Sequence, residues 1–261
     1  MKELFSFDDK KFTDKDLLLY LKRLGIKDGD CICIHSRIFE FGKPLLKPDE
    51  LLYSICNVFL DAVGEKGTVL MPTFTYSFCK NEIYDKVNSK SRVGVLGEFF
   101  RKMDGVKRTN DPIFSFAVYG KRADEFLVEI DNCFGENSPY DILAKKNGKV
   151  VMFGLKEDGY TFYIYTEQQA NVSYRYFKEF SGTIIDEHGK SKEKTIKYYV
   201  RNLDINPILD SNKRLKILED NNILKVENFA GSIICSIDAK KDLELALSTL
   251  SLDELYFNIK L

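Results

Sequence analysis

Polar side chains gather in this sequence at the ends of apolar, strand-like runs. His35, Ser36 and Arg37 follow the run CICI, and Thr73 and Thr75 follow GTVLM. In open α/β sheets, ligands bind beside the carboxyl ends of the strands, so these side chains are candidate ligand contacts. A histidine beside a serine and an arginine suits a thioester or a phosphate. Threonines in such positions are more often ordinary strand-end residues than ligand contacts.

Two carboxylates complete the candidate set. Asp111 stands in KRTNDPIFSF, between a basic pair and Ser115, and Glu167 stands in YTFYIYTEQQA. Asp111 either caps an Asp-Pro turn or faces a cleft. Glu167 is either a site residue or an ordinary carboxylate on a helix surface. The sequence around each residue leaves both readings open.

Common catalytic motifs are missing. The sequence has no Walker motif, no dinucleotide-binding glycine fingerprint, no G-x-S-x-G elbow and no HExxH. His35 and His188 are far apart and the six cysteines are scattered, so we expect no metal site. Cys31 and Cys33 should face the same side of a strand. We interpret all six as reduced core cysteines of a cytoplasmic protein.

Composition limits the class of protein. The chain has 261 residues, of which 44% are hydrophobic and 30% charged, with a net charge of −1. This balance is typical of a soluble globular protein and argues against a nucleic-acid binder. The charged start MKELFSFDDKK is unlike a signal peptide, and no apolar run is long enough for membrane insertion.

Helical and strand-like segments alternate, which predicts an α/β fold with helices flanking a central sheet. Turn residues and apolar spacing predict helices at 12–24, 47–64, 94–103 and 138–148, and strands at 31–38, 67–78, 113–120 and 149–155. Two β-like runs around a polar turn predict a hairpin inserted at 181–201, with His188 in its turn. We expect a helical segment at 203–228 with a hinge at Pro207, a last strand and helix at 231–257, and a single domain over 1–261.

Five blocks of sequence resemble a known family. They are GDCICIHSRI, EKGTVLMPTFTYSF, RVGVLGEFFRKMDGVKRTNDPIFSFAVYGKRAD, GENSPYDIL and VVMFGLKEDGYTFYIYTEQQA, and they span about residues 28–180. In this order they are similar to the aminoglycoside 3-N-acetyltransferase-like family. The resemblance implies the antibiotic N-acetyltransferase fold, with a mixed central sheet flanked by helices, which is distinct from the GNAT fold. It also implies acyl transfer from acetyl-coenzyme A, or another short acyl-coenzyme A, to an amine on a sugar.

Two positions depart from the family pattern. Antibiotic-modifying members have a histidine before the proline where this chain has Asp111. They also have a Thr-x-x-His-x-x-Glu pattern, in which Thr161 and Glu167 match but Ile164 fills the histidine position. An aspartate with a pKa of about 3.9 is a poor base toward an amine, but it can hold the amine in place by a hydrogen bond. We therefore favour Asp111 as an anchor, with the coenzyme A thiolate taking the proton; burial that raises its pKa would instead allow direct base catalysis.

The resemblance and the strand-end positions together assign provisional roles. Asp111, Glu167 and Ser115 are the expected catalytic residues, with Ser115, Ser36 or a nearby backbone amide stabilising the oxyanion. The expected cofactor contacts are His35, Ser36, Arg37, Thr73, Phe74 and Thr75. The expected acceptor contacts are Tyr76, Thr161, Tyr163 and Arg175.

The acceptor is the least determined part of the prediction. The segment 160–201 is rich in tyrosine, lysine and arginine, which suits a diphosphate better than a polycation. We therefore expect a nucleotide-linked amino sugar used in surface-glycan synthesis. The alternatives are an aminoglycoside antibiotic acetyltransferase and a non-catalytic coenzyme A-binding homologue. Partners are expected to be small molecules, without nucleic acid, and assembly into a homo-oligomer is left open.

Overall fold

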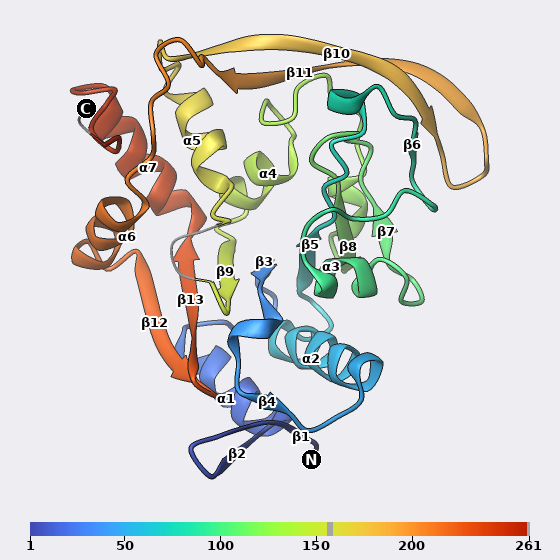
Figure 1. The fold of residues 1–261 in the computed structure, drawn as a ribbon, viewed down its shortest axis with the longest axis vertical. Helices are drawn as coiled ribbons and strands as arrows, with labels where there is room; N and C mark the ends of the chain where they lie inside the picture. The colour runs from blue at the N-terminus through green and yellow to red at the C-terminus, as the bar shows by residue number, and fades with distance from the viewer. Residues whose placement is uncertain (156–158, 260–261) are drawn as a thin grey trace.

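The structure is a computed structural model that describes residues 1–155 and 159–259 (Figure 1). Its α-helices are α1 (Asp14–Arg23), α2 (Pro48–Val63), α3 (Val95–Phe100), α4 (Pro139–Lys145), α5 (Phe162–Gln169), α6 (Ser211–Asp220) and α7 (Ala239–Leu250). Its strands are β1 (Glu3–Phe7), β2 (Lys10–Thr13), β3 (Cys31–Ser36), β4 (Lys43–Pro44), β5 (Thr68–Pro72), β6 (Tyr84–Asp85), β7 (Lys107–Arg108), β8 (Phe116–Gly120), β9 (Lys149–Phe153), β10 (Arg175–Ile185), β11 (Ser191–Arg201), β12 (Leu224–Phe229) and β13 (Ser232–Asp238).

A seven-stranded mixed sheet forms the centre, in the order β12-β13-β9-β3-β5-β8-β7. β3 runs parallel to both β5 and β9, whereas β8 is antiparallel to β5 and β13 is antiparallel to β9. The prediction of a mixed sheet flanked by helices is confirmed. The carboxyl ends of β3, β5 and β9 lie at one edge of the sheet, where ligands bind in folds of this class.

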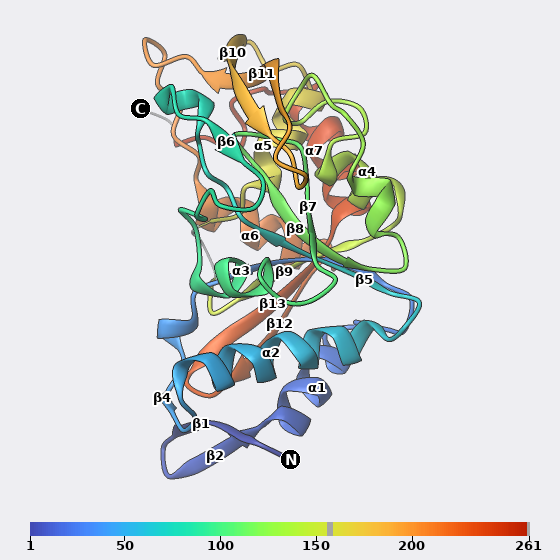
Figure 2. The same cartoon turned by 90° about the vertical axis from the view of Figure 1, so that its right-hand side faces the viewer.

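The alternation of side chains along β3 divides the core into two layers. Ile32 and Ile34 pack with residues of α1 and α2 on one face. Cys31 and Cys33 pack on the other face with residues of α4 and α5. Figure 2 shows α1 and α2 beneath the sheet and α4, α5 and α7 above it. Because side chains alternate along a strand, His35 points to the same side as Cys33.

Local signals set the helix ends that the sequence predicts. Thr13 caps α1: its hydroxyl accepts from Asp16 N at 3.2 Å, and the Asp16 carboxylate accepts from Thr13 N at 2.8 Å. Pro48 begins α2, and Gly64 follows its last turn with φ of 64°, a conformation that glycine adopts without strain. The predicted helices at 12–24 and 47–64 are thereby confirmed.

Two stretches differ from the sequence prediction. Residues 203–228 are not one hinged helical segment: Asp210 caps the short helix α6, Asn222 turns the chain at φ of 56°, and β12 follows. β12 pairs with β13, a contact that local spacing did not indicate. The predicted hairpin is present with His188 in its turn, but its strands are longer, covering 175–185 and 191–201.

The cysteines differ from the prediction in one case. All six are free thiols, and Cys79 is exposed whereas the other five are buried. Cys79 lies in a short 3-10 helix after β5, so it does not belong to the core. Within residues 1–155 and 159–259, no helix is long and apolar enough to cross a membrane.

Candidate active site

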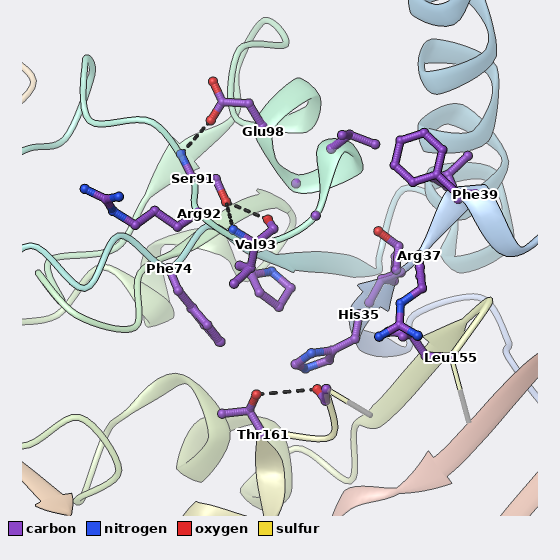
Figure 3. A pocket seen from close by; sticks show the side chains of 18 of the residues that line it. His35, Arg37, Phe39, Phe74, Ser91, Arg92, Val93, Glu98, Leu155 and Thr161 are labelled. Atoms are coloured by element: carbon purple, nitrogen blue, oxygen red, sulfur yellow. Dashed lines mark hydrogen bonds between the residues drawn. The ribbon is translucent and has the colours of Figure 1, made fainter. Parts of the chain in front are cut away.

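Two cavities form the candidate site. The larger of the two has a volume of about 640 Å³ and lies at the carboxyl edge of β3 and β5. Its walls come from the end of β3, the segment after β5, the loop that leads into α3, and the start of α5 (Figure 3). Among the predicted site residues, it brings together His35, Ser36, Arg37, Phe74, Tyr76 and Thr161. Four of the six expected cofactor contacts and two of the four expected acceptor contacts therefore share one cavity.

The segment after β5 explains why only some predicted residues line the cavity. Pro72, Phe74 and Tyr76 form part of its wall, whereas Thr73 and Thr75 are not among the lining residues and are buried. In extended chain, successive side chains point to opposite sides. The expected cofactor contacts of Thr73 and Thr75 thus receive no support from this geometry.

Side-chain hydrogen bonds instead join the end of β5 to the segment before β8, and they come from Thr73, Thr75 and Ser115. Ser115 Oγ donates to the Thr73 carbonyl at 2.7 Å, and Thr73 Oγ1 donates to the Ser115 carbonyl at 3.1 Å. Thr75 Oγ1 donates to the Pro112 carbonyl at 2.8 Å. Ser115 is buried and does not line the cavity, so the prediction that it stabilises an oxyanion has no geometric support here.

His35 is a buried cavity residue whose side chain points toward the space between Phe74 and Thr161 (Figure 3). Its Nε2 lies 3.0 Å from Tyr140 Oη, and the two rings stack at 15°. Burial lowers the pKa of His35 to about 4. The imidazole is therefore neutral at pH 7, and at this pKa it binds a proton no more tightly than an ordinary carboxylate does.

We expect this lowered pKa to make stability depend on pH. The folded-state pKa lies below the ordinary value of 6.5, so the unfolded chain binds the proton more tightly. The neutral His35 therefore contributes its full stabilisation of the folded state above about pH 6.5. This stabilisation, up to about 3 kcal/mol, is lost as the pH falls toward 4. Urea unfolding between pH 7.5 and 4 should show this loss in the wild type, whereas His35→Gln should lack that part of it. Parallel curves for the two proteins would contradict the lowered pKa.

Asp111 lies behind the cavity wall and is fully buried. Its Oδ1 accepts from Ile113 N at 2.7 Å and from Phe114 N at 2.9 Å, so it does cap a turn. Its Oδ2 is buried without a hydrogen-bond partner among the residues that the structure describes. Burial raises the pKa of Asp111, against the opposing effect of the two backbone hydrogen bonds. One carboxylate oxygen thus serves the fold, and neither candidate cavity has Asp111 among its lining residues.

A second cavity, of about 420 Å³, lies against the hairpin of β10 and β11. Basic and aromatic side chains share its wall, which is formed by Tyr163, Arg175, Tyr176, Lys178, Phe180, Tyr198, Val200, Arg201 and Leu203. None of these residues is acidic. Two predicted acceptor contacts, Tyr163 and Arg175, therefore lie here.

The cations of the second cavity differ in their partners. Arg175 is buried, and its Nε donates to Glu167 Oε2 at 2.5 Å. Lys178 and Arg201 are exposed, and neither has a carboxylate within ion-pair distance among the described residues. Glu167 lines neither cavity, and Tyr174 Oη also donates to it, at 2.9 Å. Glu167 thus positions Arg175, a role that sequence reasoning did not assign to it.

The two cavities approach each other at Tyr76 and Tyr163. Tyr76 lines the first cavity and Tyr163 the second. Burial raises the pKa of Tyr76, and Cys79 and Tyr163 add to that rise. Asp111 in turn helps to raise the pKa of Cys79, after the larger effect of burial.

Sequence reasoning missed the loop before α3. Gly94 and Gly97 line the first cavity, as does Arg92, whose Nε donates to the Thr75 carbonyl at 2.9 Å. A Cβ at Gly97 would lie 2.3 Å from the Pro72 carbonyl oxygen, so only glycine lets α3 approach β5 this closely. The spacing of the two glycines was the available signal. Among residues 1–155 and 159–259, no group of three potential metal ligands is present.

Comparisons with known proteins agree on one family. A family model described as aminoglycoside 3-N-acetyltransferase matches residues 34–250. Aminoglycoside N(3)-acetyltransferase VII of Streptomyces paromomycinus is 25% identical, over 70% of this chain and 69% of that protein. Aminoglycoside N(3)-acetyltransferase IX of Micromonospora chalcea is 27% identical, over 63% of this chain and 65% of that protein.

Solved structures give the same picture of the fold. The YokD protein from Bacillus subtilis superposes with a TM-score of 0.77 at 20% identity, covering 97% of both chains. An AAC-IIIb structure with CoASH has a TM-score of 0.77 at 21% identity, covering 92% of this chain and 97% of that one. At this identity the likeness establishes the fold, and it confirms the predicted antibiotic N-acetyltransferase architecture.

Proposed function

This chain belongs to the aminoglycoside 3-N-acetyltransferase family, and we propose that it acylates an amine of an amino sugar from a short acyl-coenzyme A held in the larger cavity. Family membership confirms the predicted class of enzyme, a coenzyme A-dependent N-acyltransferase. The observation that carries the placement of the donor is the cavity at the carboxyl edge of β3 and β5, with His35, Ser36 and Arg37 on its wall.

Aminoglycosides are the first candidate acceptors. The names of the relatives support this class over the nucleotide-linked amino sugar that the sequence favours. Asp111 lies behind the wall, so an amine that enters beside Tyr76 would reach the unpartnered Oδ2 only where that wall opens. Hydrogen bonding to that carboxylate would direct the nitrogen lone pair at the thioester carbonyl.

A nucleotide-linked amino sugar remains the second candidate because of the second cavity. Arg175, Lys178 and Arg201 present positive charge there, and no lining residue is acidic. Guanidinium and ammonium groups bind phosphate oxygens through charge-assisted hydrogen bonds, and tyrosines can stack on a base. A polycation gains nothing from this wall.

The test measures donor binding first and acceptor choice second. Calorimetry with acetyl-coenzyme A, in the presence of a chelator, should show binding. Thiol release is then followed with kanamycin-type aminoglycosides and with nucleotide-linked amino sugars, and the two classes are ranked by kcat/KM. Binding without thiol release from any amine would favour a non-catalytic homologue, and no binding of any short acyl-coenzyme A would refute the proposal.

We expect Asp111→Asn to lower kcat about 10–100-fold, because a charge-assisted hydrogen bond contributes about 1.5–3 kcal/mol. Asparagine keeps an oxygen that can accept from Ile113 N and Phe114 N, so the turn should persist. Steady-state kinetics with acetyl-coenzyme A and the preferred amine measure the loss, and the Kd of acetyl-coenzyme A should not change. A rate near that of the wild type would mean that Asp111 is a turn residue only.

A further inference from the structure

Tyr76 has a backbone conformation that is unusual for an aromatic residue. Its φ is 54°, in the left-handed region. Of the ten non-glycine residues with a positive φ in the described part of the chain, eight are asparagine or aspartate, whose short polar side chains tolerate it. A bulky side chain there is strained, and such strain gathers at functional sites when the surrounding structure maintains it. Tyr76 is therefore a candidate for a role that requires this orientation.

Backbone hydrogen bonds hold Tyr76 in the strained conformation. Thr75 N and Tyr76 N both donate to the Ile113 carbonyl at 3.2 Å. On the other side, Ser77 N donates to the Pro112 carbonyl at 3.0 Å. The segment after β5 is thus fixed on the loop before β8, and relief of the strain would break these bonds.

The ring of Tyr76 connects the walls of the two candidate cavities. Tyr76 lines the larger cavity, and its ring lies edge-on to Phe114 with centroids 5.6 Å apart. Phe114 is in turn edge-on to Tyr198, which lines the second cavity, at 4.9 Å. A donor in the larger cavity and an acceptor in the second one must react where the two spaces adjoin. We therefore expect the thioester carbonyl to lie on the Tyr76 side of the larger cavity.

The Tyr76 hydroxyl is available as a donor. No hydrogen bond among the described residues uses it, and its oxygen is not one of the buried polar atoms without a partner, so open space reaches it. Burial raises the pKa of Tyr76, so the phenol keeps its proton at pH 7. Tyrosine hydroxyls are among the donors that stabilise oxyanions. Ser115, which the sequence suggests for this task, uses its proton on the Thr73 carbonyl instead.

We propose that Tyr76 is a catalytic residue whose hydroxyl donates to the thioester carbonyl oxygen as negative charge develops there. This role rests on the function proposed above. The amine lone pair forms the N–C bond, and the carbonyl π electrons move to the oxygen, where the Tyr76 O–H stabilises them. When the carbonyl forms again, the C–S bond breaks with its electrons going to sulfur, and the thiolate takes a proton from the nitrogen. The products are the amide and free coenzyme A, and Tyr76 keeps its proton throughout.

The test uses Tyr76→Phe, which removes only the hydroxyl and keeps the ring that packs against Phe74 and Phe114. We expect kcat to fall about 10²–10³-fold, the range for loss of one oxyanion donor, while KM for the amine and Tm stay unchanged. The matched control is Tyr53→Phe. Tyr53 lies exposed on α2 and lines neither candidate cavity, so its loss of a hydroxyl should leave kcat unchanged.

A second measurement detects the contact itself. The carbonyl stretch of bound acetyl-coenzyme A falls in frequency when its oxygen accepts a stronger hydrogen bond. Difference infrared spectra with carbonyl-labelled acetyl-coenzyme A should therefore show a higher frequency in Tyr76→Phe than in the wild type. If Tyr76 contacted only the acceptor, as the sequence suggests, this band would not move. Should Tyr76→Phe fail to fold, Tyr76→Gly takes its place in both measurements, because glycine adopts this φ without strain.

The outcomes separate this role from the function on which it rests. If the wild type binds no acetyl-coenzyme A, or releases no thiol with any amine, the proposed function fails and this role fails with it. If the wild type is active and Tyr76→Phe keeps its kcat, or changes only KM for the amine with the carbonyl band in place, the role of Tyr76 alone is overturned. It is also overturned if Ser36→Ala, and not Tyr76→Phe, moves the band and lowers kcat, because Ser36 lines the same cavity and would then be the donor.

Discussion

Replacing Glu167 by alanine should lower the free energy of unfolding by about 3–5 kcal/mol. Glu167 is almost completely buried and accepts hydrogen bonds from Tyr174 and Arg175. Burial has the largest effect on the pKa of Arg175 and lowers it, but Glu167, Tyr163 and Tyr198 together outweigh burial and leave the pKa raised. Without the carboxylate, the structure would hold a buried cation with no counter-charge.

Urea unfolding at pH 7 measures the loss, and two further variants identify its cause. Arg175→Ala should also be destabilising, because it leaves the carboxylate unpaired. The double variant should cost less than the two single changes together, since neither charge then remains buried alone. Additive losses would mean that the pair is not coupled and that Glu167 contributes by packing alone.

The same substitution should have a distinct effect on the enzyme. Arg175 lines the second cavity, whereas Glu167 reaches neither cavity. Loss of Glu167 should therefore raise KM for an acceptor that uses the second cavity and leave the Kd of acetyl-coenzyme A unchanged. Glu167→Gln keeps an oxygen acceptor and should show a smaller loss on both measures.

Much of the first cavity could be predicted because it depends on local rules. Residues directly after a buried parallel strand lie at the edge of the sheet, and this rule selected His35, Ser36 and Arg37. Side chains alternate between the two sides of an extended chain, but this rule could not select the lining residues after β5, because the sequence does not show where β5 ends. Phe74 and Tyr76 therefore line the cavity, while Thr75, between them, does not.

Long-range pairing accounts for what sequence reasoning could not place. β8 runs antiparallel to β5, so the segment that precedes β8 lies beside the segment that follows β5. This pairing buries Ser115 against Thr73 and places Asp111 behind the cavity wall. β12 exists because it pairs with β13, and its own residues did not distinguish it from the helix before it. Neither contact leaves a local signal.

The second cavity was partly predictable for a different reason. The density of tyrosine, lysine and arginine at 160–201 indicated a basic, aromatic surface, and Tyr163 and Arg175 do line such a cavity. The sequence could not show that α5 and the hairpin meet there. It also could not separate the cations that line the cavity from those, such as Lys190, on the open face of the hairpin.

Reversing two charges in the second cavity should change which acceptors the enzyme prefers. We expect the double variant Lys178→Glu with Arg201→Glu to shift the ratio of kcat/KM values for a nucleotide-linked amino sugar and an aminoglycoside by about 10²–10⁴-fold toward the aminoglycoside. Two charge-assisted contacts to phosphate, at about 1.5–3 kcal/mol each, give this range. Both side chains are exposed on the hairpin, so the fold should tolerate the change.

The matched control is Lys190→Glu with Lys197→Glu, which changes the net charge equally on the same hairpin. Both lysines are exposed, and neither lines the cavity. A general effect of net charge on charged acceptors would appear in both double variants, whereas a binding contact would appear only at Lys178 and Arg201. If the ratio moves no further than in the control, the second cavity does not hold the acceptor, and the nucleotide-linked candidate loses the observation that supports it. If it moves as expected, the cavity binds the part of the acceptor remote from the reacting amine, whichever class the wild type prefers.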